Sequence, residues 1–326
     1  MSFNLFLDVS QAISRSLSRK TPVAWRQLIK ERTRLLVAVA GIGFADMLMF
    51  VQLGFQDSLY DSATLPHRLL QADLVLINPQ FKSLTSVQSF SRTRLSQAEA
   101  QTGVQSVSSI YIGMGDWQNP ETRLKRSILV WGVEPNAPSF ALPELVSELA
   151  QANALKQLNC VLFDRAGRPE YGPIAQQFTA GPPQSKSQSG LTVSLNRQTV
   201  TVAGLFTMGS SFVADGNVIT SDSTFLKIYQ DRRPDQVDIG LIQLQPGADR
   251  QQVQAELVAL LPDDVRVLTV AEFAAVEKHY WESQGTIGFI FGIGVVVGFI
   301  VGTVIVYQIL YTDVVNHLPE YATLKA

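Results

Sequence analysis

Residues Ile287–Leu310 read IGFIFGIGVVVGFIVGTVIVYQIL and carry no charged side chain. An earlier stretch, Leu35–Phe55, reads LLVAVAGIGFADMLMFVQLGF and has one charge, at Asp46. A helix rises about 1.5 Å per residue, so stretches of this length can cross a hydrocarbon core of roughly 30 Å. The stretch at 35–55 is too long, and starts too far along the chain, for a cleavable signal peptide. We therefore predict two transmembrane helices, with a buried core helix as the alternative for each.

The composition agrees with a membrane protein. Of the 326 residues, 46% are hydrophobic and 17% are charged, whereas soluble proteins carry about 25% charged residues. A net charge of -2 gives no basic field for nucleic acid, so we expect no nucleic-acid partner. One cysteine and three widely spaced histidines argue against a disulfide scaffold and a zinc enzyme.

Charge asymmetry predicts the orientation of the chain. Residues 1–34 contain seven basic and two acidic residues, so the positive-inside rule places the N-terminus in the cytoplasm. Residues 56–286 then form an external, periplasmic domain, and residues 311–326 return to the cytoplasm. We expect a multi-pass protein of the inner (plasma) membrane. Apolar residues interleave with basic ones in 1–34, which predicts an amphipathic helix at the inner headgroup layer, anchored by Trp25; a loosely ordered basic tail is the alternative.

The external domain reads as short strands alternating with helices. Predicted strands are Ala72–Asn78, Val104–Gly113, Lys125–Val133, Asn159–Phe163, Gly190–Leu195, Gln198–Phe206, Val237–Gln245 and Val265–Val270. Predicted helices are Gln56–Leu70, Ser96–Thr102, Pro143–Gln157, Asp249–Leu261 and Ala271–Gln284, the last continuing to residue 310. Asn196-Arg197 is typical of a tight hairpin, and Gly181–Gly190 and 207–213 are typical of loops. The pattern predicts an α+β domain with small sheets.

Motifs for catalysis are missing from the sequence. No GxSxG elbow and no Walker A loop occurs, and the glycines at 292–298 lie inside an apolar stretch where they cannot hold a phosphate. We therefore expect a non-catalytic chain that binds no cofactor of its own. Any ATP would be bound by another chain.

Two features inside the apolar stretches suggest contacts in the membrane. A carboxylate at the position of Asp46 would cost about 2.5–3.5 kcal/mol against lipid, so it is expected to make a polar contact at a helix interface or to serve as a proton or substrate relay. Overlapping GxxxG pairs in the second stretch predict a close helix–helix face, with the first span or a second copy of the chain as partner. Its residues are Gly288, Gly292, Gly294, Gly298 and Gly302.

The two ends of the sequence resemble a known family. The tail Tyr311–Ala326 reads YTDVVNHLPEYATLKA after a glycine-rich stretch ending VIVYQIL, and residues 22–55 begin PVAWRQLIKERTRLL. These regions resemble the DevC-type permeases of cyanobacterial ABC exporters, a branch of the MacB/FtsX superfamily. The resemblance extends over the whole chain, but in the external domain it consists mainly of position, size and strand–helix–strand order.

The resemblance implies a membrane part formed by two permease copies, with a separate cytoplasmic ATPase that binds ATP and Mg. It implies a MacB-like mechanism, in which closure of the ATPase moves the spans and the external domain rearranges with them. The implied substrate is a membrane lipid or glycolipid, passed to a periplasmic membrane-fusion protein and a TolC-like outer-membrane channel. The family has four spans, so a chain with two is expected to be a fragment or a shorter relative without the last two.

In this family the segment after the second span is the coupling helix, which contacts the ATPase. The acid, aliphatic and basic residues of the family's pattern match Glu320, Leu324 and Lys325. Apolar residues recur at helical spacing and can enter a groove on a partner, although Pro319 is expected to start or bend the helix. The expected contact residues are Asp313, Val314, His317, Leu318, Glu320, Tyr321, Leu324 and Lys325. A juxtamembrane helix without a partner is the alternative.

Two other functions remain open from the sequence. One is an FtsX-like regulator that controls a cell-wall hydrolase instead of moving a lipid. The other is a two-span envelope sensor or scaffold, against which the short cytoplasmic segment counts. A co-purified ATPase would exclude the sensor, and loss of lipid export with normal cell-wall remodelling would exclude the regulator.

Overall fold

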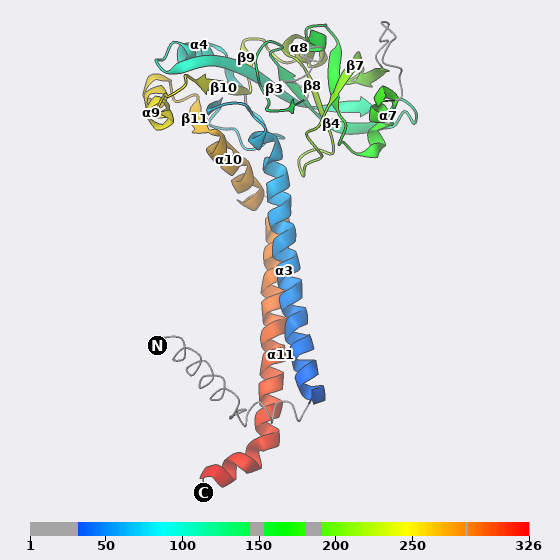
Figure 1. Ribbon diagram of the computed structural model, residues 1–326, viewed down its shortest axis with the longest axis vertical. Coiled ribbons are helices and arrows are strands. Elements are labelled where there is room, and N and C mark those ends of the chain that lie inside the picture. Colours follow the sequence, from blue (N-terminus) through cyan, green and yellow to red (C-terminus); the bar gives the residue numbers. More distant parts are fainter. Residues whose placement is uncertain (1–31, 144–152, 180–190, 284–285, 326) are drawn as a thin grey trace, which may run out of the picture. The chain divides into compact units, whose positions relative to one another are not determined.

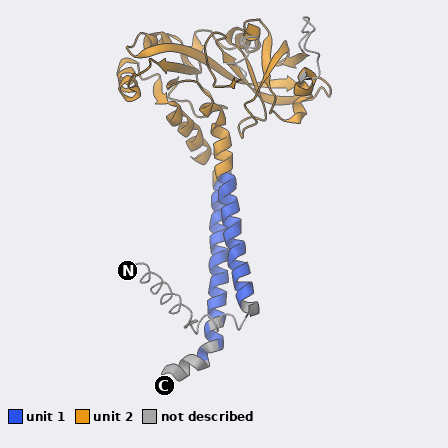
Figure 2. Cartoon of the chain, in the orientation of Figure 1, with its two compact units in different colours: residues 1–56, 289–326 blue, residues 57–288 orange. Residues whose placement is uncertain are grey.

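The computed structural model describes residues 32–143, 153–179, 191–283 and 286–325. The chain divides into two compact units (Figure 2). Unit 1 is residues 1–56 and 289–326, and unit 2 is residues 57–288. Several predicted segments lie wholly or partly outside the described residues. These are the amphipathic segment 1–34, the helix Pro143–Gln157, the loop Gly181–Gly190 and the helix continuing through residues 284–285.

Nineteen elements are assigned in the described residues (Figure 1). The helices are α3 (Arg32–Arg68), α4 (Thr93–Glu99), the 3-10 helix η1 (Pro169–Tyr171), α7 (Ile174–Thr179), α8 (Asp222–Ile228), α9 (Arg250–Leu260), α10 (Val270–Ser283) and α11 (Thr286–Lys325). The strands are β1 (Leu74–Ile77), β2 (Phe90–Ser91), β3 (Val104–Gln118), β4 (Lys125–Val133), β5 (Cys160–Asp164), β6 (Leu191–Leu195), β7 (Gln198–Phe206), β8 (Asn217–Ser221), β9 (Gln236–Val237), β10 (Ile239–Leu244) and β11 (Arg266–Thr269).

The two apolar stretches form the long helices α3 and α11. Helix α3 has 37 residues and continues beyond Phe55 to Arg68, which confirms the helix predicted after the first apolar stretch. Helix α11 has 40 residues and includes the whole second stretch and the tail as far as Lys325. Both helices are long and apolar enough to cross a membrane by length and composition.

Unit 2 is built on one nine-stranded sheet of order β11-β1-β10-β3-β4-β8-β5-β7-β6. The first four strands of that order are all antiparallel neighbours. With α4 and α9 between them in sequence they form a β-α-β-β-α-β arrangement, the ferredoxin-like split motif. Strand β1 is buried on both faces, which explains its uninterrupted LVLI sequence.

Successive residues of β1 enter two different cores, as the alternation of side chains in a strand requires. Leu74 and Leu76 pack in one cluster with residues of α4 and α9, whereas Val75 and Ile77 pack in the other with Phe273 of α10. Helices α4 and α9 therefore cover one face of this part of the sheet. Helix α10 packs on the opposite face.

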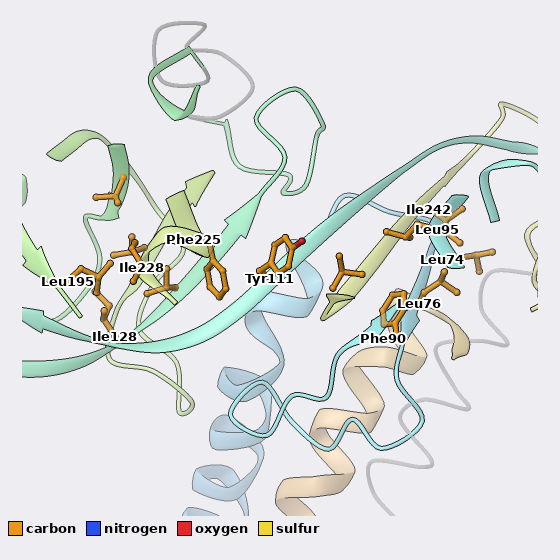
Figure 3. Close-up of a cluster of buried hydrophobic side chains, with 14 of the residues drawn as sticks. Leu74, Leu76, Phe90, Leu95, Tyr111, Ile128, Leu195, Phe225, Ile228 and Ile242 are labelled. Atoms are coloured by element: carbon orange, nitrogen blue, oxygen red, sulfur yellow. The ribbon is translucent and has the colours of Figure 1, made fainter. Parts of the chain in front are cut away.

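The remaining strands close into a six-stranded barrel. Strand β3 pairs with β4 on one side and, through Trp117 and Gln118, with β6 on the other, which closes the order β3-β4-β8-β5-β7-β6 on itself. The larger core cluster extends from the split motif into this barrel, and Figure 3 shows part of it. Tyr111 of β3 stacks on Phe225 of α8 with ring centroids 5.5 Å apart, and thereby links the two parts of the cluster (Figure 3).

The prediction of small sheets is wrong, and the reason lies in β3. Glycine weakens a strand, so the sequence predicts an end at Gly113, but the strand continues for five more residues to Gln118. Tyr229 packs over this glycine: a β-carbon on Gly113 would lie 2.8 Å from its Cζ. The long strand pairs with β10 by its first half and with β4 by its second, and so joins two sheets into one.

Most other strands confirm the sequence reading. Strands β4 and β7 have the predicted bounds, and Asn196 and Arg197 have φ of 50° and 65°, as the tight turn between β6 and β7 requires. The sequence does not predict β8 and α8. Strand β8 reads NVITS, yet all five residues are buried.

Candidate functional site

Unit 1 pairs the first part of α3 with α11. Large apolar side chains along both helices are exposed: Phe50 is 73% exposed and Phe289 is 69% exposed. A soluble protein rarely exposes apolar surface of this extent. An apolar surface of this extent is suited to contact with lipid or with other apolar helices.

The two helices of unit 1 meet at small residues. The Gln52 side chain lies over Gly294, at the position a β-carbon would take, and its Nε2 donates a hydrogen bond to the Phe291 carbonyl at 3.2 Å. A β-carbon on Gly298 would lie 2.8 Å from Cγ of Met49, and one on Gly302 would lie 3.5 Å from Cβ of Ala45. Within unit 1, three of the five predicted glycines therefore face α3.

The other two predicted glycines have different surroundings. A β-carbon on Gly292 would have nothing within 4 Å in the described residues. One on Gly288 would lie 2.7 Å from the Glu282 carbonyl oxygen and 3.3 Å from the Tyr60 hydroxyl of α3. Gly288 belongs to unit 2 by its contacts. Gly292 therefore provides a natural control for the role of Gly294.

We expect cysteines replacing Ala45 and Gly302 to form a disulfide in a Cys160→Ser background, because the β-carbons would be 3.5 Å apart and disulfides need about 3.5–4.5 Å. Adding Gly294→Ala should reduce disulfide formation, since the methyl group displaces Gln52; overpacking of this kind destabilises by about 1–3 kcal/mol. The measurement is gel mobility after mild oxidation.

Gly292→Ala is the matched control and should leave disulfide formation unchanged, since its β-carbon meets open space. Equal effects of the two substitutions, or no disulfide in the parent pair, would contradict this helix register.

The polar side chains of Asp46 and Gln52 differ in their hydrogen bonding. Gln52 is bonded within the helix pair. Asp46 is exposed on the surface of unit 1, beside Ala45, which is 2% exposed. No hydrogen bond or ion pair joins Asp46 to another described residue. The contact or relay predicted for this carboxylate stays a prediction.

The predicted coupling residues all lie on α11, which is helical through Pro319 to Lys325. Among those whose side chains are described, Val314 is 50% exposed and Leu318 is 54% exposed. One helical turn separates them, so they share a face. An exposed apolar face next to an apolar helix is suited to binding a partner.

In unit 2, a buried junction joins the end of α3 to α10. The Glu277 side chain on α10 is completely buried and accepts hydrogen bonds from the Leu84 backbone N–H at 2.9 Å and from Trp281 Nε1 at 2.8 Å. His67 of α3 is also buried, with Nε2 3.6 Å from Glu277 Oε2 and its ring edge-on to Phe273. Burial raises the pKa of Glu277 to about 7, although the two hydrogen bonds oppose this.

The loop between β7 and β8 reaches the same junction. The Phe212 ring packs against Trp281 in a T-shape at 4.9 Å, and its backbone N–H donates to Ser62 Oγ at 2.9 Å. Asp164, at the end of β5, holds the base of this loop by accepting hydrogen bonds from the Met208 and Gly209 amides. The barrel, α3 and α10 are thus connected through one set of contacts.

The junction is not evident from the sequence, although one signal is present. In α10 the buried positions Phe273 and Glu277 are one turn apart, so a charged residue occupies the apolar stripe of an amphipathic helix. A charge in that position usually has a buried partner. Its partner, His67, comes from the other end of the domain sequence, and no local pattern reveals the pairing.

The buried carboxylates of unit 2 make structural contacts. No group of three or more His, Cys, Asp or Glu in the described ranges could hold a metal ion. The buried carboxylates Asp164, Asp238 and Glu277 are engaged by neighbouring donors. These contacts hold the strands and helices of unit 2 together.

The solved structures that are similar to this chain include parts of MacB, of the transporter YknZ and of a permease protein. The periplasmic region of MacB from Actinobacillus actinomycetemcomitans has 14% identity over 64% of this chain and 92% of that chain, with a TM-score of 0.45. The extracellular domain of the noncanonic ABC-type transporter YknZ from Gram-positive bacteria has 13% identity over 61% and 100%, with a TM-score of 0.40. A domain of a permease protein from Porphyromonas gingivalis has 14% identity over 62% and 90%, with a TM-score of 0.33. No protein-family model and no curated protein matches the chain.

Proposed function

We propose that this chain is the membrane subunit of an ATP-driven exporter of the MacB/FtsX type. One observation carries the proposal: two helices with exposed apolar side chains, α3 and α11, flank a single α+β unit in the sequence. The resemblance of the flanking sequences to permeases supports the same function. In this proposal α3 and α11 span the membrane, and the work of transport is mechanical.

The proposed orientation places the N-terminus and the tail in the cytoplasm of a cell with an inner membrane, and unit 2 outside. It rests on the excess of basic residues in 1–34 and on the net negative charge of 56–286. The helical tail, with Val314 and Leu318 exposed, is then on the side where an ATPase would dock.

The proposed chain has no catalytic role of its own and holds no cofactor. ATP and Mg belong to a separate cytoplasmic ATPase in this assignment. The junction of His67, Glu277 and Trp281 gives the external unit a route by which movement of α3 and α10 reaches the barrel, through Phe212.

The finer assignment follows the resemblance alone. It comprises a DevC-type permease, a second copy of the chain, a periplasmic membrane-fusion protein, a TolC-like outer-membrane channel and a lipid or glycolipid substrate. The exposed surfaces of α3 and α11 and the external unit are compatible with each of these proposals.

The test is purification of the tagged chain from its native membrane, followed by mass spectrometry and an ATP hydrolysis assay. The proposal predicts that an ABC ATPase co-purifies in stoichiometric amount and that the complex hydrolyses ATP. A well-folded, membrane-extracted chain without any ATPase would contradict it and favour a sensor or scaffold.

A further inference from the structure

The His67–Glu277 pair is unusual because both side chains are removed from water. Each has a side-chain exposure of 0%, and Nε2 and Oε2 are 3.6 Å apart. This separation is within ion-pair range but longer than a hydrogen bond, which needs about 2.7–3.2 Å. Neither nitrogen of His67 has a hydrogen-bond partner among the described residues.

Among the described residues of α3, segment 78–89, the loop between β7 and β8 and α10, no other charged side chain is buried. The charged and titratable side chains on the surrounding elements are Tyr60, Asp61 and Arg68 on α3, Lys82 in segment 78–89, Asp215 in the loop before β8, and Glu272, Lys278, His279, Tyr280 and Glu282 on α10. Those that carry charge are exposed or partly exposed, and several are paired, as Arg68 is with Asp61 and Lys278 with Glu282. None of these side chains provides a buried charge that would compensate a charge on the pair.

A single proton held by the pair keeps it uncharged. Burial lowers the pKa of His67 from 6.5 to about 3 and raises that of Glu277 to about 7, so the proton resides on the Glu277 carboxyl, which faces the neutral imidazole at 3.6 Å. A second proton would leave a buried positive charge, and loss of the proton would leave a buried negative one. Either charge is costly in a site closed to water.

We propose that His67 and Glu277 share one proton and act as a latch that fastens the end of α3 to α10, and that loss of this proton loosens the junction. The role of the latch, which is to control how firmly α3 and α10 hold the external unit, rests on the proposed function. The binding and loss of the proton do not rest on it.

The direction of the pH dependence follows from Glu277. Burial raises its pKa from the ordinary 4.5 to about 7. A carboxyl whose pKa is raised on folding stabilises the closed junction fully below about pH 4.5, and this contribution is lost as the pH rises through about 7. The latch is therefore closed in mildly acidic conditions and opens just above neutral pH.

Trp281 is a natural reporter, because its Nε1 donates directly to Glu277. The full chain, labelled with 5-fluorotryptophan and placed in phosphatidylcholine nanodiscs, has four tryptophans whose fluorine signals can be followed during a pH titration. Trp281→Phe assigns the signal. Trp131 is the internal control, because its Nε1 donates to the neutral side chain of Asn217.

The expected result is a shift of the Trp281 signal with a midpoint near pH 7, no shift of the Trp131 signal, and no shift at Trp281 in Glu277→Gln. His67→Phe keeps an aromatic ring against Phe273 but cannot share a proton, so the midpoint should fall by about one unit. An unchanged or higher midpoint in His67→Phe, or no titration in the wild type, overturns the shared proton.

Whether the latch fastens α3 to α10 is tested separately with Ala63→Cys in a Cys160→Ser background. Ala63 is a buried position near the end of α3. Maleimide labelling is compared with the same variant carrying Glu277→Gln at each pH, which cancels the pH dependence of the thiol. The ratio should rise up to about tenfold between about pH 6 and pH 8, and a constant ratio overturns the latch. Neither readout uses an ATPase, so this inference and the proposed function can fail independently.

Discussion

Replacing both Val314 and Leu318 by aspartate is expected to reduce the amount of co-purified ATPase at least about tenfold, while the chain still inserts in the membrane. These residues are 50% and 54% exposed and one helical turn apart on α11. If they enter an apolar groove, each substitution buries a carboxylate without a partner, and the complex loses stability. The measurement is the ATPase-to-chain ratio in the purified material.

Leu124→Asp is the matched control. Leu124 is 64% exposed in unit 2, far along the sequence from the tail, so the same change of an exposed leucine to a charge should leave the ratio unaltered. An unchanged ratio in the double variant would contradict the coupling role of the tail. It would favour the juxtamembrane helix without a partner.

Asp164→Ala is expected to destabilise unit 2 by about 3–5 kcal/mol, a large effect for one substitution. The Asp164 side chain is buried and accepts from the backbone amides of Met208 and Gly209 and from Asn217 Nδ2, at 2.9–3.1 Å. Alanine removes the acceptor from all three donors, of which Met208 and Asn217 are buried. The free energy of unfolding, measured for the full chain in nanodiscs by denaturant titration, checks this.

Asp164→Asn keeps one acceptor oxygen and the size of the side chain, so its effect should be clearly smaller. Because the loop carrying Phe212 starts beside these donors, Asp164→Ala should also increase proteolysis between 207 and 216. Equal stability of the two variants would mean that Asp164 is not the anchor of this loop.

The sequence predicts those features that depend on local pattern. The run Ile287–Leu310 predicts a long apolar helix, the apolar run within Lys125–Val133 predicts a strand, and Asn196-Arg197 predicts a turn with positive φ. In each case the physical cause lies within a few neighbouring residues. Nothing distant is needed.

Features that depend on distant partners are not predictable in this way. Strand β8 reads as polar, but Asn217 is bonded to Asp164 and Trp131, and Thr220 Oγ1 donates to the Cys160 carbonyl. Closure of the barrel needs the pairing of β3 with β6, which no local signal shows. The His67–Glu277 junction is of the same kind, since Glu277 is recognisable as a charge in the apolar stripe of α10 but no local pattern identifies His67 as its partner.

The central claim is that α3 and α11 span a membrane, with unit 2 on one side and the tail on the other. Single cysteines replacing Gln251 in α9 and Asn316 in α11, both exposed positions, test it in a Cys160→Ser background with a membrane-impermeant maleimide. In intact cells whose outer membrane has been permeabilised, the account predicts labelling at 251 and labelling at 316 only after the inner membrane is disrupted. Equal labelling of both positions before disruption would contradict it.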